Sequence, residues 1–296
     1  MPGWMSESGR GVIRRWPLVT SDLRRADWED RCVVHPAVLG DGRELPCVEQ
    51  GDPDGVPVVL IHAWLDSLHC FDQLMAALPE RVRAFAFDQR GHGDASKPVD
   101  GYGLRDFAGD IGAFMDAVEL DAAVLVGASS GGYVAQRFAV DNPDRTLGLA
   151  LLGSPRSLRG PRPKFADVLA TLDDPIDAAF VRELNEGMVE REIPEAVIAK
   201  LCEENLKVPA RVWRDAFEGL LAAEPPLDTG RISAPTLIVW GARDSLLPRA
   251  DQEAMAAEIP GARLAIYADV GHLPVVEAPE RIAADLTALC DMVAAR

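Results

Sequence analysis

The amino-acid sequence predicts an α/β fold in which helices flank both faces of one mostly parallel sheet. Short apolar runs rich in β-branched residues alternate along the chain with segments of helical spacing, the pattern of strand–helix–strand units. The chain has 296 residues, 48% of them hydrophobic, so it can bury the core that such a sheet needs. The alternation is interrupted between about residues 155 and 230, where no segment resembles a strand.

The first half of the chain begins with a predicted β-hairpin. Two extended runs, 31–40 and 45–51, are joined through "DGRE", and an Asp-Gly turn between extended runs is typical of a hairpin. The runs that follow, such as "VPVVLIHA", lack polar alternation, as expected of strands buried on both faces. In chain order we expect strands at 56–63, 82–88, 122–129 and 146–154, and helices at 71–78, 104–118 and from Gly131.

The second half resumes the alternation after the helical stretch. Strands are expected in "PTLIVWGARD" and "ARLAIYADVGH", with a helix near 252–258 and another at the end of the chain. The helical stretch itself should lie over the carboxyl edge of the sheet, where open α/β sheets bind ligands, and form a lid. We therefore divide the chain into an N-terminal arm at 1–30, a core at 31–154 and 231–296, and a lid, or cap, at 155–230.

Charge and composition exclude several functions. The formal net charge is −17, and an acidic chain repels phosphate backbones, so we expect no nucleic-acid partner. The cysteines are scattered and form no CxxC pair, which favours free, mostly buried thiols over a disulfide framework. We expect neither a metal ion nor a cofactor. The N-terminal stretch lacks an apolar signal-peptide core and no segment approaches a membrane span, so we expect a cytoplasmic protein without a membrane partner.

The strongest chemical signal is the stretch Gly127-Ala128-Ser129-Ser130-Gly131, between a predicted strand and a predicted helix. It fits the pattern G-x-S-x-G, in which a nucleophilic serine occupies a sharp turn and small neighbours let strand and helix approach each other. A frame shifted by one residue would make Ser130 the nucleophile. We favour Ser129, because glycine lies two positions before it and two positions after it. In the shifted frame, the residue two positions before Ser130 is alanine.

A serine nucleophile needs a base and an orienting carboxylate. Of the five histidines, only His272 follows the last predicted strand, on a loop that can return to the sheet edge. Asp244 follows the strand before it, at a carboxyl end. The order Ser129, Asp244, His272 agrees with a Ser–Asp–His triad of G-x-S-x-G hydrolases. Asp269 is the rival acid, but its position three residues before His272 favours a role in capping the loop.

The loop after the first long strand offers a second part of the site. The backbone N–H groups of Trp64 and Ser130 are candidates for an oxyanion hole, and His62 is expected to bond backbone groups beneath the site. An apolar substrate pocket is predicted from the side chains of Trp213, Phe217 and Leu220 on one stripe of the lid, together with Trp64 and Leu246.

With these motifs the chain resembles the α/β-hydrolase superfamily from roughly residue 31 to its end. The pieces that carry the resemblance are "VVLIHAW", "FDQRGHGDASKP", "LVGASSGGYVAQRFA", "PTLIVWGARDSLLP" and "VGHLPVVEAPERIAADL". The resemblance implies an eight-stranded, mostly parallel sheet flanked by helices, a helical cap after the sixth strand and a Ser–His–Asp triad. It also implies that Asp88, Arg90 and His92 brace the sheet edge.

The chain departs from the family at one position beside the predicted oxyanion hole. The family usually has His-Gly where this sequence has His62-Ala63. Alanine adds a methyl group there and disfavours positive φ, so the hole is expected to be narrower or differently angled.

These features predict a serine hydrolase of the carboxylesterase type that forms an acyl-enzyme on Ser129. Lactonase activity is the nearest alternative, and carbon–carbon bond hydrolases and cofactor-free perhydrolases share the fold and the serine. Serine at the elbow disfavours dehalogenases and epoxide hydrolases, which resemble this fold but use aspartate there. The expected partner is a small ester or lactone, and the sequence leaves both a monomer and a homo-oligomer open.

A different class also fits this fold. A ligand-binding receptor with slow turnover, in which lid movement recruits a partner, could keep the same triad. Ligand-dependent capture of a partner with negligible turnover would favour the receptor over the enzyme.

Overall fold

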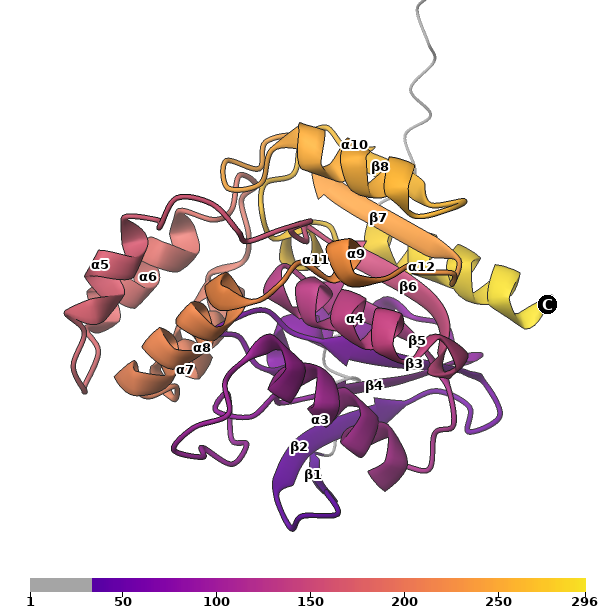
Figure 1. The fold of residues 1–296 in the computed structure, drawn as a ribbon, viewed down its shortest axis with the longest axis horizontal. Helices are drawn as coiled ribbons and strands as arrows, with labels where there is room; N and C mark the ends of the chain where they lie inside the picture. The colour runs from indigo at the N-terminus through magenta and orange to yellow at the C-terminus, as the bar shows by residue number, and fades with distance from the viewer. Residues whose placement is uncertain (1–33) are drawn as a thin grey trace, which may run out of the picture.

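The computed structural model describes residues 34–296, so the predicted N-terminal arm at 1–30 and Cys32 lie outside the described residues. One eight-stranded sheet has the order β1-β2-β4-β3-β5-β6-β7-β8 (Figure 1). The β1–β2 and β2–β4 pairs are antiparallel, and all other neighbours are parallel. The strands are β1 (His35–Val38), β2 (Glu44–Gln50), β3 (Val56–Ile61), β4 (Val82–Phe87), β5 (Ala123–Ala128), β6 (Thr146–Leu152), β7 (Thr236–Gly241) and β8 (Arg263–Tyr267).

Helices cover both faces of the sheet, as the alternating sequence predicts (Figure 1). One face packs against α3 (Leu104–Ala117), α4 (Ser130–Asp141) and α10 (Arg249–Glu258). The other packs against α2 (Asp72–Ala77), α11 (Pro274–Glu277) and α12 (Pro279–Ala294). The central strand β5 is buried along its whole length, which explains its unbroken apolar run. Two 3-10 turns, Leu68–Phe71 and Pro143–Arg145, precede α2 and β6.

The predicted hairpin is present. His35 pairs with Cys47 and Val38 with Glu44, and Gly42 in the connecting turn has a φ of 84°, which suits glycine. The four cysteines among the described residues, Cys47, Cys70, Cys202 and Cys290, are buried and free.

The helical insertion between β6 and β7 forms the cap beyond the carboxyl ends of the parallel strands (Figure 1). Polar contacts attach it to the core. The Asn205 side chain donates to the Leu65 carbonyl at 2.9 Å, the Arg211 guanidinium to the carbonyls of Lys97 and Pro98 at 2.7 Å each, and Lys207 pairs with Asp94 at 2.9 Å. The cap contains α5 (Phe165–Ala170), α6 (Ala178–Glu186), α7 (Glu195–Leu206), α8 (Ala210–Ala222) and α9 (Pro226–Thr229).

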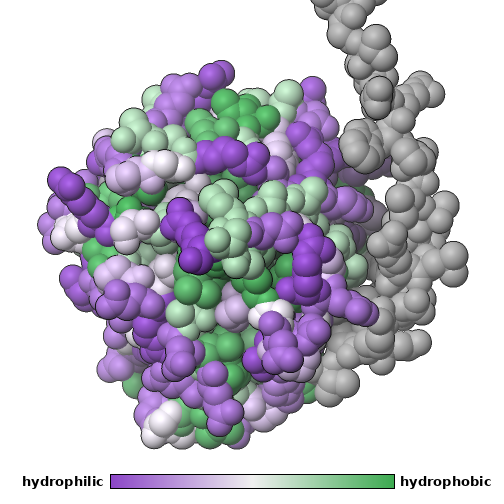
Figure 2. Space-filling view, turned by 90° about the vertical axis from the view of Figure 1, so that its right-hand side faces the viewer, coloured by the Kyte–Doolittle hydropathy of each residue, from purple (hydrophilic) through white to green (hydrophobic). Residues whose placement is uncertain are grey.

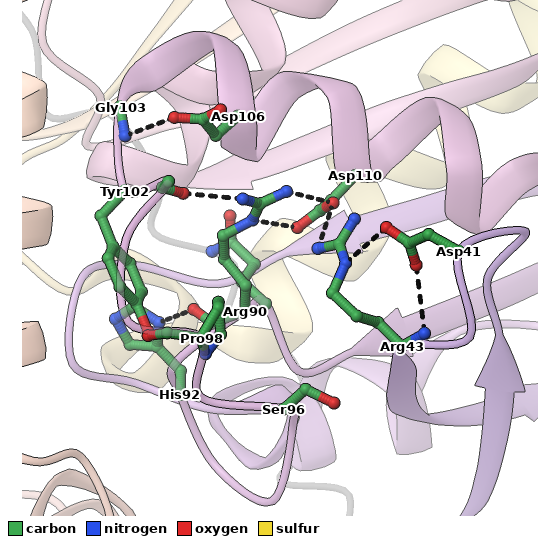
Figure 3. A network of polar contacts seen from close by, with 12 residues as sticks. Asp41, Arg43, Arg90, His92, Ser96, Pro98, Tyr102, Gly103, Asp106 and Asp110 are labelled. Carbon is green, nitrogen blue, oxygen red and sulfur yellow. Dashed lines mark hydrogen bonds and ion pairs between the residues drawn. The ribbon is translucent and has the colours of Figure 1, made fainter.

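A buried ion network braces the edge of the sheet below the cap, as the resemblance implies (Figure 3). Arg90 makes two contacts of 2.6 Å with the carboxylate of Asp110, which also pairs with Arg43 at 2.8 Å. Asp88 accepts hydrogen bonds from the backbone N–H groups of Leu68 and Asp94. His92 Nδ1 lies 2.9 Å from the Arg90 carbonyl, so Asp88, Arg90 and His92 all hold loop backbone or a neighbouring helix in place.

The surface mixes polar and apolar residues. On the face turned away from the cap, hydrophilic residues surround small groups of hydrophobic ones (Figure 2). Within residues 34–296, no helix combines the length and the apolar character needed to cross a membrane.

Candidate active site

Ser129 occupies a strained turn between β5 and α4. Its φ of 46° and ψ of −119° lie outside the regions that most residues adopt. The flanking glycines are needed for close approach: a Cβ on Gly127 would lie 2.3 Å from the Gly132 Cα, and one on Gly131 would lie 2.3 Å from the His62 carbonyl oxygen. The turn therefore centres on Ser129, whereas Ser130 is the first residue of the helix.

A hydrogen-bonded relay connects Ser129 with two distant segments. Its Oγ lies 2.9 Å from His272 Nε2, and His272 Nδ1 lies 2.9 Å from Asp244 Oδ2. The side chains of His272 and Asp244 are buried, which strengthens their interaction. With Asp244 ionised, Nδ1 donates to it and Nε2 is left to accept the Ser129 proton. The structure thus brings together the three side chains that the sequence nominates.

The Asp244 carboxylate is itself held in place. Its Oδ1 accepts hydrogen bonds from the backbone N–H groups of Leu246 and Leu247, at 2.8 and 3.0 Å, while Oδ2 faces the imidazole. The rival acid Asp269 instead contacts Arg281 at 2.7 Å, and this hydrogen bond lowers the pKa of its carboxyl. Asp269 is therefore engaged elsewhere.

The two predicted oxyanion donors, Trp64 and Ser130, lie beside the elbow. The N–H of Ser130 belongs to the first turn of α4, where backbone donors have no partner within the helix. The Trp64 N–H donates to the Ser130 hydroxyl at 2.6 Å. The loop that carries Trp64 is thus fixed against the start of α4.

The alanine beside this loop does not require unusual backbone geometry. Among the described residues, the non-glycine positions with positive φ are Leu65, Glu119 and Ser129, so Ala63 is not one of them. The left-handed conformation is taken by Leu65, two residues further on, at a φ of 76°. The backbone at Ala63 therefore needs no positive φ that alanine would disfavour. The methyl group of Ala63 is the remaining difference from the glycine that is usual in the family.

His62 has a structural role, as predicted. Its Nε2 accepts the backbone N–H of Gln89 at 2.9 Å, and its Nδ1 lies 2.7 Å from the Ala63 carbonyl. Burial, with a smaller contribution from the nearby His92, lowers the pKa of His62 to about 3. A neutral imidazole with its proton on Nδ1 satisfies both contacts.

An aromatic cluster links the oxyanion loop to the cap. The Trp64 ring lies 5.0 Å from Phe217, 5.6 Å from Trp213 and 6.0 Å from Phe165, measured between centroids. The Trp64 indole N–H also donates to the Trp213 carbonyl at 3.2 Å. Sequence reasoning did not identify Phe165, or Phe180 at 6.5 Å from it, because neither belongs to a motif or to the end of a sheet strand.

The predicted substrate-contact residues differ in exposure. Trp213 is fully buried and Leu220 nearly so, which places both in the packing of the cap. Leu246 is 57% exposed. Phe217 is half-buried, and its ring centroid lies 5.0 Å from that of Trp64, compared with 5.6 Å for Trp213, so Phe217 is the residue of the predicted stripe that best fits a contact with substrate.

No metal centre accompanies these residues. Within the described part of the chain, no three His, Cys, Asp or Glu side chains come together as a ligand set. The chemical groups gathered at this edge are a hydroxyl, an imidazole, a carboxylate and backbone donors. Such an arrangement can attack a carbonyl carbon and stabilise the resulting oxyanion.

Comparison with known proteins agrees with this arrangement. A family model described as the alpha/beta hydrolase family matches residues 58–285. A pimeloyl-[acyl-carrier protein] methyl ester esterase of Neisseria meningitidis is 28% identical, over 78% of this chain and 92% of its own length. A non-heme chloroperoxidase of Streptomyces lividans is 27% identical, over 84% of this chain and 96% of its own length. The crystal structure of a putative aryl esterase from Burkholderia cenocepacia superposes with a TM-score of 0.78 at 26% identity, covering 89% of this chain and all of that one.

Proposed function

Because the chain belongs to the alpha/beta hydrolase family, we propose that it is a serine hydrolase that cleaves carboxylic esters through an acyl-enzyme on Ser129. The observation that carries this proposal is the continuous relay from the Ser129 Oγ through both nitrogens of His272 to Asp244. The relay has the geometry required of a nucleophile, a base and an orienting acid.

In the proposed reaction, Ser129 Oγ attacks the ester carbonyl carbon while His272 Nε2 takes the hydroxyl proton. The resulting tetrahedral intermediate collapses when the imidazolium returns that proton to the departing alkoxide, which leaves as an alcohol. A water molecule then attacks the acyl carbon while His272 takes its proton. The second tetrahedral intermediate collapses when that proton passes to Ser129 Oγ, which breaks the acyl–Oγ bond and releases the carboxylic acid. The buried Asp244 stabilises the imidazolium during both halves of the reaction.

The oxyanion is assigned to the backbone N–H groups of Ser130 and Trp64. The Ser130 donor acts with the partial positive charge at the start of α4. The Trp64 donor becomes available when the substrate oxygen replaces the Ser130 hydroxyl as its acceptor. Two fixed donors of this kind supply a large share of the rate enhancement in acyl transfer.

The substrate is proposed to be a small ester with an apolar acyl or alcohol part. The half-buried rings of Trp64 and Phe217 provide the apolar wall, and two of the similar proteins are named as esterases. A lactone is an intramolecular ester and would react in the same way. The similarity to a chloroperoxidase favours testing peracid formation as well.

A panel of p-nitrophenyl esters and lactones tests the proposal. The wild-type protein should hydrolyse short-chain esters, and Ser129→Ala should lower kcat by on the order of 10³-fold or more, because the nucleophile is lost. Mass spectrometry should find the acyl group on the peptide that contains Ser129. No turnover of any ester or lactone, combined with ligand-dependent capture of a protein partner, would replace this proposal with the receptor function.

A further inference from the structure

The carboxylate of Glu277 is buried and surrounded by backbone N–H groups. Glu277 ends α11 and is 5% exposed. The N–H groups of four residues donate to its two oxygens: Gly271, Leu273, Glu190 and Arg191. Hydrogen bonds to an ionised carboxylate are stronger than neutral ones, so this cluster holds its donors tightly.

The four donors come from two separate parts of the molecule. Gly271 and Leu273 flank His272, and they donate to Oε1 at 3.0 and 3.3 Å. The Gly271 N–H also lies 3.1 Å from Oε2. Glu190 and Arg191 belong to the cap, in the segment between α6 and α7, and both reach Oε2 at 3.0 Å. Oε1 therefore serves the histidine loop alone, whereas Oε2 holds both cap donors and also accepts from Gly271, so the two segments meet at one carboxylate.

Two further hydrogen bonds join the same segments. The backbone N–H of His272 itself donates to the Met188 carbonyl at 3.1 Å. The Arg191 guanidinium donates to the Glu277 carbonyl at 2.6 Å. Cap residues 188–191, which we call the junction segment, thus contact the histidine loop directly as well as through the Glu277 side chain.

We propose that Glu277 is a positioning residue that makes the catalytic placement of His272 depend on docking of the junction segment. This inference rests on the proposed function, because it gives His272 the role of base. When the segment is docked, Glu277 fixes the residues on both sides of His272 and the imidazole lies 2.9 Å from Ser129. When the segment leaves, the His272 N–H and the Oε2 atom of Glu277 lose their cap partners.

The consequence for catalysis follows from the precision that proton transfer requires. A displacement of about 1 Å in a catalytic group can cost on the order of 10²-fold in rate. The cap also carries Phe217, part of the proposed substrate wall. The cap therefore both completes the substrate pocket and holds His272 in place. His272 is fully positioned only when the cap covers the pocket.

Glu277→Gln is the test, because glutamine keeps the size of the side chain but has only one acceptor oxygen. If its NH₂ group takes the place of Oε1, the Leu273 contact and one of the two Gly271 contacts are lost; if it takes the place of Oε2, both cap contacts are lost. Either orientation weakens the link between the cap and the histidine loop. We expect kcat for a p-nitrophenyl ester to fall by about 10²-fold with little change in KM, because His272 is misplaced and the substrate wall is retained. The matched control is Glu280→Gln, three residues away and exposed, which should match the wild-type protein.

Amide hydrogen exchange of the resting protein provides a readout that needs no turnover. In Glu277→Gln, the amides of Glu190 and Arg191 should lose protection together with those of Gly271 and Leu273. Arg191→Ala reaches the same junction from an exposed position and is not expected to prevent folding. It should produce a smaller change of the same kind in exchange and in kcat.

The outcomes separate this inference from the proposed function. If the wild-type protein hydrolyses no ester, the proposed function fails, while linked exchange of the two segments in both variants still supports the coupling. Exchange that changes in only one segment would overturn the coupling. An unchanged kcat in Glu277→Gln would overturn the positioning role, and so would a rise in KM without a fall in kcat. If Glu277→Gln does not fold, Arg191→Ala decides by the same criteria.

Discussion

The backbone N–H of Trp64 donates to the hydroxyl of Ser130 at 2.6 Å, across the turn that carries Ser129. Trp64 follows β3 and Ser130 begins α4, so this contact closes the space between two neighbouring strand ends. In the proposed reaction the same N–H must donate to the substrate oxygen. The Ser130 hydroxyl therefore occupies a position that the substrate competes for, and it satisfies a buried donor until the substrate arrives.

Ser130→Ala separates the two serines of the elbow. It removes the hydroxyl and leaves the backbone N–H, so we expect kcat/KM to change by less than about tenfold, since a neutral hydrogen bond contributes roughly 1 kcal/mol. Ser129→Ala should instead abolish nearly all turnover. Both are measured with the same short-chain ester. Loss of turnover in Ser130→Ala but not in Ser129→Ala would show that the nucleophile is Ser130.

The triad could be nominated from the sequence because each member follows a recognisable strand. Ser129 directly follows β5, and Asp244 and His272 lie on the loops that follow β7 and β8. The carboxyl ends of parallel strands meet at one edge of the sheet. The sequence also distinguished Ser129 from Ser130 as the residue at the turn. Glycine is required where β5 and α4 approach each other, at Gly127 and Gly131.

Other features depend on packing that no local pattern records. Helical spacing grouped Trp213 with Phe217 on one stripe, but it could not show that Trp213 is fully buried while Phe217 is half-buried. The apolar character of Leu246 suggested a pocket residue. Its backbone N–H instead bonds to Asp244 in the turn, and its side chain is exposed. The hydrogen bond that the Glu190 N–H donates to the Glu277 carboxylate joins residues 87 positions apart, so it forms only when the cap is in place.

Asp244→Asn should lower kcat by about 10⁴-fold, as replacing the acid of such a triad can do. The Leu246 and Leu247 N–H groups need an acceptor, so they will hold the amide oxygen of the asparagine. The NH₂ group then faces His272 Nδ1, which must become the unprotonated nitrogen. Nε2 carries the proton in that tautomer and cannot accept one from Ser129.

The measurement for Asp244→Asn is kcat on the same ester, with thermal unfolding as the check on folding. The variant should unfold within a few degrees of the wild-type protein, because the carboxamide keeps the two backbone hydrogen bonds. Retention of more than a tenth of the wild-type kcat would contradict the role given to Asp244. Asp269→Asn is the matched control, since Asp269 pairs with Arg281, and it should leave kcat unchanged.

The buried carboxyl of Asp66 should make stability depend on pH. Burial raises the pKa of Asp66 to about 7, and a hydrogen bond with Asn205 partly opposes this shift. The folded state therefore holds the proton more tightly than the unfolded state, in which an aspartate titrates near 3.9. The stabilisation from this group is complete below about pH 4 and is lost as the pH rises through about 7.

Asp66→Asn removes that titration. The melting temperature of the variant relative to the wild-type protein should therefore be higher at pH 8 than at pH 4. His62 and His92 act in the opposite direction, because burial lowers the pKa of each, but they are present in both proteins and cancel in the difference. Equal differences in melting temperature at pH 4 and pH 8 would show that Asp66 does not titrate in this range.

Phe217→Ala tests whether the ring beside Trp64 limits the substrate. The two centroids are 5.0 Å apart, and removing a half-buried ring next to the oxyanion loop opens space on the cap side. We expect kcat/KM to fall for p-nitrophenyl acetate and to rise for the octanoate, so that their ratio shifts by about tenfold, as a few buried methylene groups can produce. Leu206→Ala, on the exposed side of α7, is the control and should leave the ratio unchanged. A ratio that Phe217→Ala does not alter would place the acyl chain away from this ring, and equal losses for both esters would indicate damage to the Trp64 loop instead.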